Sequence, residues 1–309
     1  MKYIIENACT LFYGQEQKNS FLFDESKVLY KANHFTQYNH MRINADQFVV
    51  TPGHVMIDFD VVHMNDFHAF KERMKHLLNL GCTTYITACD IQYENQLYTR
   101  LKQAKHALIN SSIDYVVGVK VPLSKLSVTF VRKCCKLKVP IIFVDVNDMY
   151  DMYSVQWQWI RQELFPYQPA IIPIWNVEAS KRKLNRLKSE WAELLTMNKI
   201  TTKTSVPNEQ TPLSKQFLLT IGVYPEKGSL QVNCDADYLL FLKENLIDGQ
   251  IDFERVRPKV VFATGKVKKA GSTILMQPGI GKELEVKVPK KFVPISEALE
   301  PSQIFMLGD

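Results

Sequence analysis

The sequence predicts an α/β protein combined with a β domain, and two patterns lead to this fold class. Residues 54–175 alternate apolar runs with amphipathic stretches of helix length, which is the pattern of a parallel βα sheet. The flanking segments, residues 1–51 and those from 217 onward, contain short β-rich runs separated by polar and glycine turns. We therefore expect a parallel βα domain placed between two β-rich segments.

The predicted parallel sheet has five strands, each a short apolar run rich in β-branched residues. The strands are expected at residues 54–62, 83–90, 115–122, 140–147 and 170–175. Helices are expected at residues 66–80, 93–109, 127–138 and 154–165, followed by a longer basic helix at 181–199. Phe70, Met74, Leu77 and Leu78 show the three- and four-residue spacing on which the first helix is predicted.

The domain organisation follows from the inability of a short β segment to bury both of its faces alone. Residues 1–51 and 217–309 are expected to form one composite β-sandwich. Residues 52–200 are expected to form a reduced parallel βα barrel or an open sheet. Residues 201–216 are polar and contain two prolines, so they are predicted to be a linker or a mobile loop.

Composition excludes several classes of protein. The 309 residues are 46% hydrophobic and 23% charged, which is ordinary for a globular chain. No run approaches the roughly 20 apolar residues of a membrane span, and the first residues lack the pattern of a signal peptide, so a cytoplasmic location without membrane association is expected. A net charge of +6 is mild for this length, and nucleic-acid binding is not indicated.

Two stretches combine residues typical of tight turns with the start of an apolar strand. Residues 222–241 contain Lys227-Gly228 and then Asp235-Ala236-Asp237 ahead of an apolar strand, a pattern that resembles the hydantoinases, dihydroorotases and related members of the amidohydrolase superfamily. Residues 43–60 contain Pro52-Gly53 ahead of the first parallel strand, which is similar to that family's entry into its barrel. The resemblance implies a TIM-like barrel. This one is expected to be truncated, because the basic helix and the polar linker occupy the place of the final strands.

The resemblance also implies a metal site, with altered ligands. In the family, histidines, a carboxylated lysine and an aspartate hold two metals; here Asp58 and Asp60 take the positions of the first-strand histidines. Lys120 takes the position of the bridging lysine, and Asp145 that of a later histidine. Carboxylates favour magnesium, manganese or calcium over zinc. Asp58, Asp60, Lys120 and Asp145 are therefore candidate metal ligands, and no catalytic residue is assigned.

These substitutions allow three interpretations. The carboxylates could pair with Lys120 as a charge cluster without chemistry, hold a hard cation without catalysis, or support a working hydrolase of amide or cyclic amide bonds. We expect the first, a binding or regulatory pseudoenzyme without a cofactor, with a metal-dependent hydrolase of non-peptide C–N bonds as the alternative. A structural or assembly protein is a further class, which predicts no small-molecule pocket between the sandwich and the parallel sheet.

Three other features have both a plain and a functional interpretation. His63 follows the first strand as either a surface residue or a displaced ligand, and Cys89 ends a strand without an obvious histidine partner for nucleophilic chemistry. The basic helix is either a solvated face or a site for an acidic partner. A shortened barrel also leaves strand edges that a helix, a loop or a second chain must cover, so a homodimer or another protein partner is expected.

Overall fold

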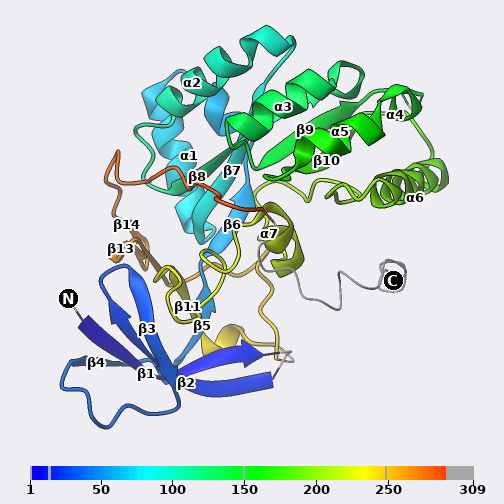
Figure 1. Ribbon diagram of the computed structural model, residues 1–309. Coiled ribbons are helices and arrows are strands. Elements are labelled where there is room, and N and C mark those ends of the chain that lie inside the picture. The colour runs from blue at the N-terminus through cyan, green and yellow to red at the C-terminus, as the bar shows by residue number, and fades with distance from the viewer. Residues whose placement is uncertain (1, 13–14, 149, 248, 290–309) are drawn as a thin grey trace.

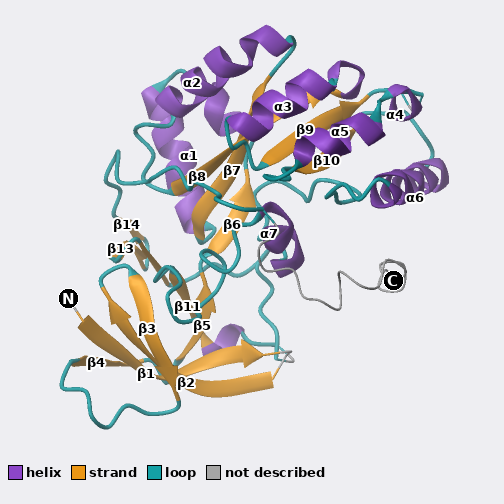
Figure 2. Cartoon of the chain, viewed as in Figure 1, coloured by secondary structure: helices purple, strands orange, loops and turns teal. Residues whose placement is uncertain are grey.

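The computed structural model describes residues 2–12, 15–148, 150–247 and 249–289, which form two sheets (Figures 1 and 2). One sheet is parallel and carries most of the helices, and the other is mixed and contains the N-terminal strands. Residues 290–309, which belong to the predicted composite domain, lie outside the described part of the chain. Within the described residues, no helix combines the length and the apolar character needed to cross a membrane.

The parallel sheet is a curled half-barrel of five strands in sequential order. Its strands are β6 (His54–Ile57), β7 (Cys82–Asp90), β8 (Asp114–Pro122), β9 (Ile141–Val146) and β10 (Ala170–Trp175). Every neighbouring pair is parallel. The predicted fold class is confirmed, because the apolar β-branched runs are strands and the amphipathic stretches between them are helices.

The outer face of the half-barrel is covered by helices that precede or follow the strands (Figure 1). They are α1 (Phe67–Asn79), α2 (Leu97–Ala107), α3 (Val128–Lys136), α4 (Asp151–Ser154), α5 (Trp157–Leu164) and α6 (Lys181–Met197). Three of them begin at a side-chain cap, in which Asp66, Ser127 or Ser180 accepts a hydrogen bond from a backbone N–H of the first turn. Their buried faces enclose the larger hydrophobic core.

The inner face of the half-barrel is covered by α7 (Lys215–Ile221), where β-like sequence was expected from residue 217. Ser214 caps this helix, and Gly222 ends it with a φ of 81°, a conformation that favours glycine. Phe217 and Leu218 pack against inward-facing strand residues such as Phe143. A short apolar run fits a buried helix as well as a strand, so periodicity could not separate the two. β structure resumes only at Tyr238.

The predicted linker supplies backbone hydrogen bonds to both edges of the parallel sheet. The carbonyl of Thr201 accepts from the Ile171 N–H of β10 at 2.9 Å, and the N–H of Leu213 donates to the Val55 carbonyl of β6 at 2.9 Å. This segment therefore runs from one edge strand to the other and satisfies part of each edge from within the chain. The predicted dimer or protein partner stays a prediction.

The mixed sheet curls back on itself. Its strands are β1 (Lys2–Phe12), β2 (Gln15–Asp24), β3 (Lys27–Ala32), β4 (Met41–Asn44), β5 (Phe48–Pro52), β11 (Tyr238–Leu242), β12 (Val260–Ala263), β13 (Lys266–Ala270) and β14 (Thr273–Ile274). The order runs from β14 through β11 and β5 to β3, with β4 beside β1. Backbone bonds between β3 and residues 233–236, which lead into β11, close the curl around an aromatic core of Tyr3, Phe23 and Tyr238.

Candidate functional site

The carboxyl ends of the parallel strands bring four polar residues to the inner face of the half-barrel. Asp90 ends β7, Lys120 and Asp145 lie near the ends of β8 and β9, and Asn176 follows β10. Each lies an even number of residues from an inward-facing apolar residue of its own strand, so strand alternation directs it inward. Active sites of βα barrels gather at this end of the sheet.

These residues form one chain of ion pairs and hydrogen bonds centred on Lys120. Its Nζ lies 3.8 Å from Oδ1 of Asp90 and 3.8 Å from Oδ1 of Asp145. His63 Nε2 lies 3.1 Å from the other oxygen of Asp90, and the amide of Asn176 donates to Oδ1 of Asp145 at 3.2 Å. Burial raises the pKa of Asp145, while Lys120 and Asn176 oppose that shift. We call His63, Asp90, Lys120, Asp145 and Asn176 the Lys120 network.

Asp58 and Asp60 lie against a different cation. Asp58 is fully buried, and its Oδ2 lies 3.5 Å from Nε of Arg73 on α1 and accepts a hydrogen bond from Gln210. Asp60 is exposed and binds the same guanidinium at 2.9 Å. Burial raises the pKa of Asp58, and Arg73 partly offsets this. The structure therefore brings Lys120 and Asp145 together, and groups Asp58 and Asp60 separately around Arg73.

Asp90, Asn176 and Arg73 were missed from the sequence. Asp90 and Asn176 could have been found by alternation, since each lies at or just after the carboxyl end of a predicted strand. Arg73 gave no comparable signal, because only the packing of α1 against the sheet brings it to the two aspartates. Cys89 is buried, donates weakly to the Gly118 carbonyl at 3.8 Å and has its pKa raised by burial to about 12, so it is not poised as a nucleophile.

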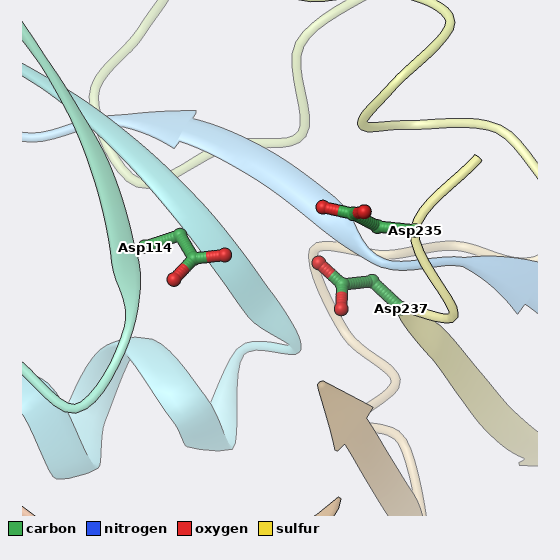
Figure 3. Close-up of side chains that lie close together, drawn as sticks. All are labelled: Asp114, Asp235 and Asp237. Carbon is green, nitrogen blue, oxygen red and sulfur yellow. The ribbon is translucent and has the colours of Figure 1, made fainter. Parts of the chain in front are cut away.

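A second cluster lies at the opposite, amino-terminal end of β8, where Asp114, Asp235 and Asp237 converge (Figure 3). One oxygen from each of these carboxylates lies within 4.8 Å of the others, a spacing from which a cation could be held. The expectation that no metal binds is therefore not supported by the side chains present. The last two aspartates come from the motif that carried the family resemblance.

Lys227, from the same motif, supplies a cation to this cluster. Its Nζ lies 2.6 Å from Asp114, 2.8 Å from Asp235 and 2.7 Å from Asp237, and the side chain is 1% exposed. Burial disfavours the ammonium, but the three carboxylates outweigh burial and raise the pKa of Lys227. A metal ion would have to displace this ammonium to use all three carboxylates. We call these four residues the Lys227 cluster.

A cavity of about 1060 Å³ adjoins the Lys227 cluster, between the mixed sheet and the parallel sheet. One side is lined by the first residues of β3 and β13, Lys27 and Lys266, and by Asn233 ahead of β11, and segment 280–288 lines the other. That segment pairs with the start of β8, where the Tyr115 N–H donates to the Lys282 carbonyl at 3.0 Å. We call this space the intersheet cavity.

Comparison with solved structures shows that the chain has the hydantoinase fold. It is similar to D-hydantoinase from Bacillus sp. AR9, with a TM-score of 0.66 and 9% identity over 93% of this chain and 99% of that one. L-Hydantoinase (dihydropyrimidinase) from Arthrobacter aurescens matches with a TM-score of 0.65 and 12% identity, over 92% and 99%. Dihydropyrimidinase from Brevibacillus agri NCHU1002 matches at 0.57 and 13%, over 93% and 99%.

These similarities confirm the resemblance drawn from the sequence at the level of the fold. No protein-family model and no curated protein matches the chain. Fold alone does not determine activity, so function has to be argued from the residues of the sites.

Proposed function

We propose that the chain is a binding or regulatory protein of the amidohydrolase type that does not hydrolyse amide bonds. The observation that carries this proposal is the position of Lys120, whose ammonium lies between Asp90 and Asp145. A lysine that bridges metals does so through a carboxylated side chain, whereas here the Lys120 Nζ lies within ion-pair distance of two carboxylates. The strands after β7 contribute no histidine, since all seven histidines lie at or before residue 106. His63 is then the single imidazole of the Lys120 network, so zinc would lack the set of several histidines that usually holds it.

The intersheet cavity favours binding over a purely structural role. A structural or assembly protein was expected to have no small-molecule pocket between the sandwich and the parallel sheet. A cavity of about 1060 Å³ at that place is in the size range of ligand pockets.

A metal-dependent hydrolase of non-peptide C–N bonds is the second candidate. Its support is the oxygen-rich set of Asp90, Asp145 and Asn176 beside His63, at the end of the sheet where barrel enzymes place their ligands. Such a set would suit magnesium or manganese better than zinc.

Metal content and hydrolysis separate the two candidates. The full chain is purified without chelators, its metals are measured by mass spectrometry, and hydantoin and dihydrouracil are tested as substrates. We expect well under one metal ion per chain and no turnover above buffer with added zinc, manganese or magnesium.

Stoichiometric metal that is lost from Asp90→Asn/Asp145→Asn, together with turnover, would overturn the proposal. Metal that is lost only from Asp235→Asn would place the ion at the Lys227 cluster, away from the candidate catalytic end, and leave the proposal standing.

A further inference from the structure

The lysines that line the intersheet cavity exceed the carboxylates available to them. Three of the five lining carboxylates bind lysines from outside the lining: Asp114 binds Lys227 at 2.6 Å, Glu283 binds Lys105 at 2.7 Å, and Glu285 binds Lys138 at 2.6 Å. A fourth, Asp235, is shared by Lys227 and the lining residue Lys27. Lysines of the protein therefore already balance the negative charge of these four carboxylates.

Three lining lysines, by contrast, make no ion pair within the described residues. They are Lys266 on β13 and Lys282 and Lys287 on segment 280–288. Among the lining carboxylates, Glu226 alone makes no ion pair with a described cation. The uncompensated charge around the cavity is therefore positive, and lysines from both sides contribute to it.

A buried lysine beside the cavity lacks a hydrogen-bond partner in the part of the chain that the structure describes. Lys268 lies two residues from Lys266 on β13 and is only 2% exposed, and its Nζ has no hydrogen-bond partner in the described structure. Burial lowers the pKa of Lys268, and the charges of Asp114, which lines the cavity, and Asp237 oppose that shift. A buried ammonium without a partner is costly, so an acceptor from a ligand would satisfy a group that the protein leaves unpaired.

We propose that the intersheet cavity binds a small, multiply charged oxyanion, held between Lys266 of the mixed sheet and Lys282 of segment 280–288. Carboxylates and phosphates share the chemistry that such lysines recognise. The apolar side chains of Val232, Ile280 and Val288 also line the cavity and leave room for an organic portion of the ligand. This proposal names the ligand class of the proposed binding function and rests on it. It concerns the opposite end of the sheet from the Lys120 network.

The test uses the full chain, with inorganic phosphate and citrate as separate probes. Binding is measured by calorimetry at constant ionic strength, with sodium chloride replacing the probe in the reference titration. We expect saturable binding of at least one probe, and the tighter one identifies the phosphate or carboxylate chemistry. Amide chemical shifts should move at Ser26, Asn233 and Thr264, which line the cavity.

Charge reversal provides the specificity control. Lys266→Glu/Lys282→Glu should weaken binding at least tenfold, whereas Lys102→Glu/Lys125→Glu, an equal change of charge at exposed sites away from the cavity, should weaken it less than twofold. Unchanged thermal unfolding will show that both variants are folded. Weak binding without saturation, or equal loss in both variants, would mean an adventitious ion only and would overturn the proposal. That failure is independent of the metal and hydrolysis measurements that test the proposed function.

Discussion

The ammonium of Lys227 lies 2.6 Å from a carboxylate oxygen of Asp114, and this contact joins the loop before the mixed-sheet strand β11 to the first residue of the parallel strand β8. The same ammonium binds Asp235 and Asp237. The Lys-Gly and Asp-Ala-Asp motif therefore holds the two sheets together at the end of the barrel away from the Lys120 network.

Removal of this lysine should be strongly destabilising. Lys227→Met would leave three carboxylates without their shared cation, two of them nearly fully buried, and should lower the free energy of unfolding by about 3–5 kcal/mol in urea denaturation. Lys18→Met removes an exposed partner of Asp46 and should cost less than about 1 kcal/mol. A small loss in Lys227→Met would contradict a structural role for the cluster.

A divalent cation should distinguish the same variant from the natural chain. In Lys227→Met the three carboxylates lose their shared ammonium, and among the described residues only Asp235 keeps a lysine partner, Lys27. The cluster can therefore hold calcium or magnesium, and millimolar calcium should raise the melting temperature. The natural chain should respond little, because Lys227 already compensates the carboxylates. Equal stabilisation of both proteins would show that the cation binds elsewhere.

The helix that covers the inner face of the half-barrel should contribute substantially to stability. Phe217→Ala would open a cavity against the inward-facing residues of the sheet and should cost about 3–5 kcal/mol in urea denaturation. Gln216→Ala, on the exposed side of the same helix, should change the free energy of unfolding by less than about 0.5 kcal/mol. Similar values for the two variants would show that α7 is not packed on the sheet.

His54 should make stability fall in mild acid. Burial lowers the pKa of this histidine from an ordinary value near 6.5 to about 4, and its Nε2 has no hydrogen-bond partner among the residues that the structure describes. Because the unfolded chain binds the proton more readily, stability is complete above pH 6.5 and falls between pH 6.5 and 4, by roughly 3 kcal/mol for this group. Denaturation at a series of pH values should show a shallower fall for His54→Leu than for the natural chain. The exposed His68→Leu should retain the natural slope.

Gly228 should resist substitution for two separate reasons. Its φ is 73°, and a Cβ there would lie 2.5 Å from the Cδ1 of Leu218 on α7. Gly228→Ala should therefore cost about 2–4 kcal/mol by adding backbone strain and crowding the inner core. Gly271→Ala shares a positive φ of 61° but has open space around it, so only the backbone part of the loss is expected there. Equal losses of unfolding free energy in the two variants would show that crowding against Leu218 does not contribute.

The sequence by itself determined the parallel sheet, its five strands and most of its helices, because residue spacing reports which side of an element is buried. The spacing of Phe70, Met74, Leu77 and Leu78 and the cap at Ser127 are local features, so α1 and α3 were predictable without knowledge of the packing. The hydantoinase-like fold was also predictable, because its turn motifs are contiguous in the chain.

Only the tertiary structure decided which charged groups meet. The sequence resemblance assigned Asp58 and Lys120 to one metal site, yet Asp58 lies against Arg73 of α1 while Lys120 lies between Asp90 and Asp145. The same holds for the inner face of the half-barrel, which α7 covers in place of the final strands. These pairings depend on how segments distant in the sequence pack against one another. The spacing of residues within one segment does not predict that packing.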